Sequence, residues 1–446
     1  MQTKKLLYFS LFVFLISLSI YRVDLSLGFL PFKITPILIS ALYLILLFLF
    51  FFLRTNKIKI RKFNFLIVYI SLILSVIQFS FIINIIRMSE IEYLQILRFI
   101  LFSVVLVSSV IFIYLFDKLS NFYKYTLISK FINISLFIYI FFSILEVYYF
   151  FNGKYFLMEN NTVLHGLIYP YPHTIGPYFP RITGGFVDPN ISSYFLTSIF
   201  FLSILLNKSK AKIISFLLII LTFSRSGIFG LLLGSIVYKL FTILYNYKIY
   251  KRFNIYLYFK SFIKKIILYM FILFLFFVLL QITLNIILQI LTVRFNEDLK
   301  EGSGAIHLKL IFYALSKLND DFVSILIGYG FNSSYIFSQI FFPGNKYANF
   351  HSEYITFLFE EGIIGLLSYL LIYYIIIYHL MLKSKCLNIK TKVIIFSSLI
   401  SLASFNIFYQ QFIFNYYWVY LFIMYYILKI KCNNFIILIQ NKGTRK

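Results

Sequence analysis

The sequence is short of charge, and of acidic charge above all. Only 13% of its 446 residues are charged, and 15 Asp and Glu stand against 41 Lys and Arg. In contrast, 61% are hydrophobic and 22% aromatic, which is more apolar surface than a soluble core can bury. This composition excludes a soluble globular domain and predicts a polytopic membrane protein. A formal charge of +26 favours nucleic acid only in a soluble protein, so we expect no nucleic-acid partner.

Cysteine and clustered metal ligands are also scarce. The two cysteines, Cys386 and Cys432, lie in Lys-rich segments that we expect in the cytosol, which argues against a disulfide framework and a thiolate metal site. The five histidines are widely scattered, and neither an H-E-x-x-H motif nor a D-x-D pair is present. We therefore predict no metal ion and no cofactor.

Long hydrophobic runs fill most of the chain. A bilayer core about 30 Å thick takes roughly 20 apolar residues per helix. We predict an all-α polytopic integral membrane protein with about twelve transmembrane helices, the seventh of them short, at residues 6–21, 34–53, 63–86, 99–116, 131–151, 191–206, 213–223, 227–245, 266–291, 355–381, 393–409 and 416–430. The first run lacks a small-x-small cleavage site and is interpreted as an uncleaved helix. No internal repeat or soluble segment is evident, so residues 1–446 are predicted to form a single membrane domain.

Basic clusters mark alternate connections between these runs. They lie at both termini and at residues 54–62, 118–130, 208–212, 248–265 and 383–392. The positive-inside rule places these loops and both termini in the cytoplasm. Every acidic residue except Asp117 then maps to the outer face, which indicates that this face carries the polar chemistry. The alternative is that the Lys-rich inner loops leave acidic residues no other place.

Two outer connections are much longer than the others. Residues 152–190 form the first large periplasmic loop and hold five of the eight prolines, and residues 292–354 form the second and hold most of the outer charge. Loops of this length are usually functional or disordered, and their Pro, Gly and aromatic content favours ordered lids. Residues 305–318 of the second loop have the pattern of an amphipathic helix.

The first loop ends in PRITGGFVDPNISS, residues 180–193. Asp188 is expected to cap a helix whose first turn begins with Pro189. Arg181 lies outside the membrane near this helix N-terminus, where an arginine is suited to binding an anion such as phosphate. Contact with lipid headgroups is the alternative for Arg181.

A second arginine, Arg225, lies in TFSRSG, between two hydrophobic runs. The run before it is only about eleven residues long, which places Arg225 at or below the outer membrane surface. An ionisable residue at that depth predicts a functional site. Snorkelling of the side chain to the membrane surface is the alternative.

A polar cluster opens the tenth run, in NKYANFHSEYITFLFEEGIIG, residues 345–365. His351 is a natural general base because its unperturbed pKa is ~6.5, and Glu353 is placed to fix its tautomer. We expect Asn349 to cap the helix, although a direct His351–Glu353 pair needs a helix that begins later. An inert surface histidine is the alternative. The remaining residues are interpreted as a membrane boundary (Glu360, Glu361) and helix-packing positions (Gly362, Gly365).

Other residues of the second loop give weaker signals. Arg294 is either a site residue or an interfacial anchor. His307 and Lys309 lie on different faces of the predicted helix, so only one of them can point into a site. Gly328 and Gly330 are interpreted as turn positions, because no phosphate-binding glycine spacing surrounds them.

Four motifs stand in a fixed order across residues 181–375: GGFVDPNISSYF, TFSRSGIFGLLLG, GSGAIHLKL with ILIGYGFNS, and FHSEYITFLFEEGIIGLLSYL. In these motifs the chain resembles the O-antigen polymerase and O-antigen ligase family of bacterial inner-membrane proteins. The resemblance implies about twelve helices, cytoplasmic termini and large periplasmic loops. It also implies action on undecaprenyl-diphosphate-linked glycans without a metal or a nucleotide sugar.

The resemblance assigns site residues as well. It implies functional positions for Arg181, Arg225 and His351, with Arg294 as a weaker transfer. The helix after the Gly-Ser-Gly step commonly begins with Arg in this family, whereas the corresponding residue here is His307. An imidazole holds a phosphate only as imidazolium or through a hydrogen bond.

Together these inferences give the hypothesis of a membrane glycosyltransferase that polymerises undecaprenyl-diphosphate-linked repeat units into O-antigen, capsule or a related polysaccharide. The assigned residues are His351 and Arg225 for catalysis, and Arg181, Arg294, His307 and Glu353 for binding the diphosphate or glycan. Expected partners are the lipid-linked glycan, membrane lipid, a flippase and a chain-length regulator. The alternatives are an O-antigen ligase, a polysaccharide flippase or transporter, which the few polar residues within the spans disfavour, and a non-enzymatic scaffold.

Overall fold

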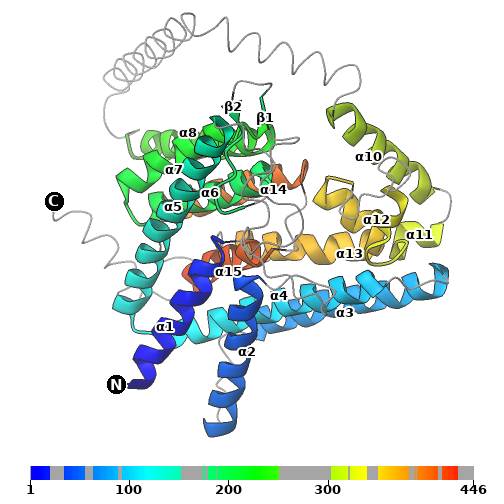
Figure 1. Ribbon diagram of the computed structural model, residues 1–446, viewed down its shortest axis with the longest axis horizontal. Helices are drawn as coiled ribbons and strands as arrows, with labels where there is room; N and C mark the ends of the chain where they lie inside the picture. Colours follow the sequence, from blue (N-terminus) through cyan, green and yellow to red (C-terminus); the bar gives the residue numbers. More distant parts are fainter. Residues whose placement is uncertain are drawn as a thin grey trace, which may run out of the picture.

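The described part of the chain is almost entirely helical (Figure 1). The computed structural model describes residues 2–20, 35–55, 64–88, 93–151, 174–175, 179–186, 188–250, 303–319, 322–338, 350–380, 387, 389–409 and 414–429. Its one small sheet pairs the two-residue strands β1 (Thr174–Ile175) and β2 (Phe179–Pro180) in antiparallel fashion. The predicted all-α class is therefore confirmed.

The helices follow the predicted hydrophobic runs closely. Those that coincide with predicted runs are α1 (Gln2–Ser17), α2 (Pro36–Thr55), α3 (Asn64–Met88), α4 (Tyr93–Lys118), α5 (Asn121–Phe151), α6 (Pro189–Leu205), α7 (Ser209–Leu221), α8 (Arg225–Tyr250), α13 (Glu353–Tyr378), α14 (Ile389–Asn406) and α15 (Asn415–Lys429). The predicted run at 266–291 lies outside the described residues. Among the described residues, α4, α5, α8, α13 and α14 contain stretches long and apolar enough to cross a membrane, and shorter apolar stretches lie in α1, α2, α3 and α6. The protein is thus a multi-pass membrane protein, and the number twelve stays a prediction.

Helix α15 forms the centre of the main hydrophobic core. Every residue from Tyr416 to Leu428 is buried, including the fully enclosed Trp418. A helix that is apolar and buried on all sides must be surrounded by other helices, and Figure 1 shows α15 in the middle of the bundle. Large apolar side chains on α2, α3 and α8 remain exposed, as expected of surfaces that face lipid.

A second, smaller core lies beside this bundle. Helix α10 (Ser303–Asn319), which confirms the predicted amphipathic helix, buries Leu310, Ala314 and Leu318 against Phe350 and Phe359. The short helices α11 (Phe322–Ile327) and α12 (Ser333–Ser338) complete this region. We call α10, α11, α12 and residues 350–361 the α10–α12 unit; its three helices lie at the right of Figure 1.

The α10–α12 unit joins the bundle where α13 is broken. Gly362 has φ 67° and ψ −166°, so α13 consists of two helices rather than one. A Cβ at Gly362 would overlap the carbonyl oxygen of Leu326, and one at Gly328 (φ 75°) would overlap the carbonyl of Glu360. The N–H groups of Tyr329 and Gly330 donate to the oxygens of Phe359 and Glu360, each at 2.8 Å. The loop thereby satisfies carbonyls that the break releases, and Gly362 does more than permit close packing.

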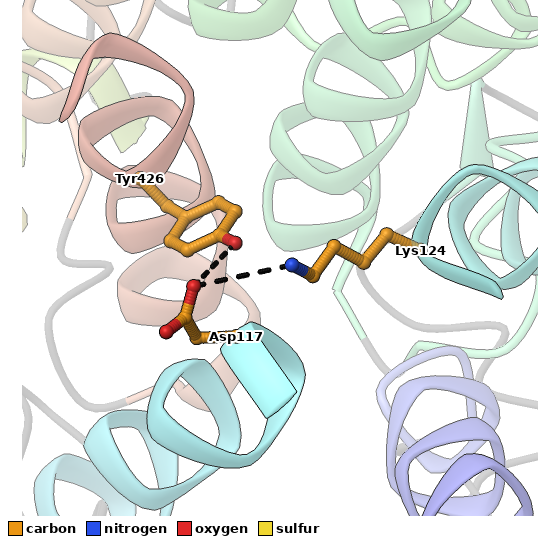
Figure 2. A network of polar contacts seen from close by, with 3 residues as sticks. All are labelled: Asp117, Lys124 and Tyr426. Carbon is orange, nitrogen blue, oxygen red and sulfur yellow. Dashed lines mark hydrogen bonds and ion pairs between the residues drawn. The ribbon is translucent and has the colours of Figure 1, made fainter. Parts of the chain in front are cut away.

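Contacts at the two ends of the bundle agree with the predicted alternation of loops. At one end, Lys124 Nζ lies 3.9 Å from Asp117 Oδ1, to which the Tyr426 hydroxyl donates at 2.7 Å (Figure 2). Lys208 donates to the carbonyl of Ser129 at 2.8 Å, so two predicted cytoplasmic clusters meet. Segments predicted to lie outside meet at the other end, as described next.

Candidate functional site

Arg181 lies in the bundle directly after β2, with only 8% of its surface exposed. Its Nε donates to the carbonyl of Thr222 at 3.1 Å, and Nη2 donates to Asn190 Oδ1 at 3.5 Å. These bonds hold the guanidinium between the start of α6 and the connection from α7 to α8. The first predicted arginine is therefore fixed beside the segment that carries the second.

The turn after Arg181 is held by a carboxylate from α5. Glu146 accepts hydrogen bonds from the N–H of Thr183 at 2.9 Å, from the Thr183 hydroxyl, and from the N–H of Gly184 at 3.1 Å. Gly184 has φ 58°, and a Cβ on Gly185 would overlap the carbonyl oxygen of Ser19. The double glycine therefore lets the chain turn tightly against α1 and α5, while Glu146 fixes the turn.

Helix α6 begins as the sequence predicts. Asp188 is the N-cap and accepts from Asn190 N at 2.6 Å and Ile191 N at 3.3 Å, with Pro189 in the first turn. The Asn190 side chain then links the two arginine motifs, because its Oδ1 accepts from both Arg181 and the Ser224 hydroxyl, the latter at 2.8 Å. Sequence reasoning assigned no role to Asn190.

Arg225 is the first residue of α8, and its side chain is exposed. Ser224 caps this helix by accepting from Gly227 N at 3.1 Å. A Cβ on Gly227 would overlap the Ser193 hydroxyl, so this glycine lets α8 start close to α6. Helix α7 has only 13 residues, as the short seventh run predicted. Two arginines with different exposure thus lie on connected segments.

His351 precedes α13 in a left-handed backbone conformation, with φ 53°. The helix begins at Glu353 with Ser352 as the N-cap, so the prediction that Asn349 caps it is wrong. Asn349 itself lies outside the described residues. The neighbouring Phe350 is buried in the second core, with its ring centroid 4.7 Å from that of Phe359. The α10–α12 unit therefore determines where His351 lies, and the imidazole is partly exposed.

Tyr409, just after α14, connects His351 to the arginine side of the site. Its ring lies 6.0 Å from the imidazole, with the planes at 64°, and its hydroxyl lies beside the Asp188 carboxylate. Burial raises the pKa of the Tyr409 phenol, the Asp188 carboxylate raises it further, and the Arg181 charge opposes this. Tyr409 is one of 38 tyrosines, and its only sequence signal is the short polar step YQQ between two runs.

Glu353 lies on the first turn of α13 with its side chain fully buried. It interacts electrostatically with tyrosines of the bundle that include Tyr369 and Tyr373. Both phenols accept from Asn406 Nδ2, at 2.7 and 3.1 Å respectively. Glu353 therefore belongs to a polar cluster inside the bundle.

The remaining predicted residues are described only in part. Arg294 lies outside the described residues, and His307 is in α10, where its side chain is not described. On the same helix Lys309 is exposed and Leu310 is buried. Within the described ranges, no group of three or more His, Cys, Asp or Glu side chains is arranged to hold a metal ion.

Comparison with known proteins identifies one matching family. Residues 211–370 match a family model described as O-antigen ligase, which confirms the resemblance seen in the sequence motifs. The matched segment contains Arg225, the α10–α12 unit and His351, whereas Arg181 and Tyr409 lie outside it. A search of curated proteins found no match.

Proposed function

This multi-pass membrane protein carries an O-antigen ligase domain over residues 211–370, and from this premise we propose that it is a polymerase of lipid-linked glycan repeats. It joins undecaprenyl-diphosphate-linked repeat units into O-antigen or a related surface polysaccharide. The reaction takes place at the outer face of the bacterial cytoplasmic membrane, where the positive-inside rule puts both large loops.

One observation carries this proposal. Three segments far apart in the sequence, which hold Arg181, Arg225 and His351, are joined through Asn190, Asp188 and Tyr409 at the same end of the bundle. Such a site combines one buried and one exposed arginine with one imidazole. This is the set of groups that a glycosyl transfer with a diphosphate leaving group requires.

In the proposed reaction, His351 removes the proton from a hydroxyl of the acceptor sugar. The hydroxyl oxygen forms a bond to the anomeric carbon of the donor, and the bond from that carbon to the diphosphate oxygen breaks. Negative charge grows on the departing diphosphate, so cations fixed beside it lower the barrier. His351 must be neutral to act as a base, and proton transfer then converts it to imidazolium.

The two arginines take different parts in this scheme. Arg225 is exposed at the first turn of α8, where the helix dipole also favours an anion, and it contacts the diphosphate directly. Arg181 is buried and bonded to Thr222 and Asn190, so it contributes positive charge and holds the Arg225 segment in place. Arg294 and His307 complete the proposal as further contacts of the diphosphate or glycan, whereas Glu353, expected from the sequence to bind there too, is fully buried and supports the site from inside the bundle.

The proposal is tested with membranes that contain the protein and lipid-linked repeat units. Wild-type protein is expected to produce a ladder of lengthened lipid-linked chains. His351→Ala and Arg225→Ala are each expected to lower the rate about 10²- to 10³-fold, because each removes a group that acts in the transition state. Lys309→Ala, which removes an exposed cation from α10, serves as the control and retains full activity. The proposal is contradicted if both variants insert into the membrane at normal levels and still produce full-length polymer.

An O-antigen ligase is the second candidate, because the matched family model carries that description. A ligase transfers a finished glycan to another lipid acceptor in one step, so it yields a single product and no ladder. The same membranes, supplied with a finished lipid-linked glycan and a lipid acceptor, separate the two activities. Movement of glycan across vesicles without a new bond points instead to a flippase.

A further inference from the structure

We infer that Tyr409 is a positioning residue that holds the His351 imidazole in its reactive orientation. The inference rests on the proposed function, since it assumes that His351 is the base. No family motif of the sequence includes Tyr409, and it lies outside the segment that matches the family model.

The hydroxyl end of Tyr409 is anchored to a rigid part of the bundle. It lies beside Asp188, whose Oδ1 accepts from the N–H groups of Asn190 and Ile191. These cap bonds fix the carboxylate at the N-terminus of α6, a helix with almost all of its residues buried. The phenol therefore lies next to a carboxylate that does not rotate freely.

The ring of Tyr409 contacts two other rings. Phe405, buried at the end of α14, lies 6.3 Å away with the planes at 64°. The His351 imidazole lies 6.0 Å away, also at 64°. Edge-type contacts at this separation are favourable for aromatic pairs, so the ring limits the rotation of the imidazole.

The backbone at His351 does little to fix the orientation of the imidazole, so a contact from a neighbouring side chain is needed. His351 has φ 53°, and it lies between Phe350 in the second core and the buried Ser352. Its side chain is partly exposed at the boundary between the α10–α12 unit and the bundle. The contact with Tyr409 thus fixes the base relative to the arginine segments, which belong to the bundle.

Charged groups lie close to this contact. Asp188 and Arg181 both act on the Tyr409 phenol, and His351 is the neighbouring titratable ring. Proton removal from the acceptor converts the imidazole to imidazolium, so the charge beside Tyr409 changes during the reaction. Because burial and Asp188 raise the pKa of Tyr409, the phenol keeps its proton and is not itself the base.

Two substitutions separate the ring from the hydroxyl. Tyr409→Leu removes both, and we expect kcat to fall about tenfold while KM for the lipid-linked substrate stays unchanged. The acidic limb of the pH profile should also move, because the imidazole loses the ring beside it. Tyr409→Phe keeps the ring but not the hydroxyl beside Asp188, and we expect a loss in kcat of about threefold, with the limb nearly in place. Phe408→Leu, at an exposed neighbour, is the control.

A double substitution makes the test decisive. In a His351→Ala background, Tyr409→Phe should cause no further loss of the residual activity, because the base that it positions is absent. The inference is wrong if the two losses in activity multiply in the double variant. It is also wrong if Tyr409→Leu raises KM and leaves the pH profile unchanged. Both outcomes leave the proposed function intact. If His351→Ala alone has full activity, the proposed function fails first. Should Tyr409→Leu fail to insert, the Tyr409→Phe pair still decides the question.

Discussion

The arginine side and the histidine side of the candidate site are supported in different ways. Arg181 is buried in the main bundle, on a turn that Glu146 holds with three hydrogen bonds. His351 is partly exposed and is placed by the α10–α12 unit, which has a core of its own. The positive charge is thus preorganised in the bundle, while the base is carried by a separately packed element.

This difference has a chemical reason within the proposed function. The diphosphate is the same in every donor, so the groups that stabilise it gain from a rigid setting. The acceptor sugar is the part that varies between polysaccharides, and the base must meet its hydroxyl. The α10–α12 unit has its own small core and meets the bundle through side chains, which include Arg98 to Asn332 and Tyr354 to the Ala403 carbonyl. The acceptor side of the site can thus differ from the diphosphate side without changing the bundle core.

The largest effect is expected from Gly362→Ala, which disrupts the histidine side of the site. A Cβ there overlaps the Leu326 carbonyl, and the φ of 67° costs a non-glycine residue about 1–3 kcal/mol besides. We expect little folded protein, measured as the monodisperse fraction after detergent extraction, and no polymer ladder. Ile363→Ala, at the exposed next residue, should extract normally. Normal yield and activity from Gly362→Ala would show that the break in α13 is dispensable.

A smaller effect is expected from Glu146→Ala, which disrupts the arginine side of the site. It leaves the buried N–H groups of Thr183 and Gly184 without their acceptor, at a cost of about 1–3 kcal/mol each. The turn then shifts Arg181, and a displacement of about 1 Å lowers the rate about 10²-fold. Polymer formation per folded molecule is the measurement.

The matched variants sharpen this result. Glu146→Gln keeps one oxygen acceptor and should lose less activity than Glu146→Ala. Ser143→Ala, one turn earlier on α5, removes a hydroxyl that donates to the Tyr139 carbonyl of its own helix, and should leave activity unchanged. Equal losses from the alanine and glutamine variants would point to the charge of Glu146 rather than to the turn.

Much of the fold could be predicted because hydrophobic runs and caps are local signals. The short α7, the amphipathic α10 and the Asp188 cap all follow from neighbouring residues. The break at Gly362 could not, because EEG inside an apolar run fits a continuous helix. It is explained only by the backbone around Leu326 and Gly328, more than thirty residues away in the sequence.

The candidate site shows the same division between local and distant information. Arg181, Arg225 and His351 stood out as polar residues near membrane helices, and family motifs surrounded them. Asn190 and Tyr409 did not, because each matters through partners from other segments. The N-cap of α13 was misjudged because Asn349 and Ser352 are equally good caps by residue type, so residue type alone does not locate the helix start.

The smallest effect is expected from the opposite end of the bundle. Asp117→Asn weakens the network in Figure 2, in which Asp117 accepts from Tyr426 and pairs with Lys124. Because Asp117 is partly exposed and the ion pair spans 3.9 Å, we expect a loss in stability of about 1 kcal/mol. A slightly lower thermal unfolding midpoint in detergent is the measurement, and polymer formation per folded molecule should not change.

Tyr426→Phe is the matched variant for this end, since it removes the hydrogen bond and leaves the ion pair. It should lower the midpoint by less than Asp117→Asn and also leave activity intact. If either variant reduced the rate as strongly as Glu146→Ala, the two ends of the bundle would be energetically coupled. The rigid setting of Arg181 would then depend on packing along α5, which carries both Lys124 and Glu146, and not on the turn at Thr183 alone.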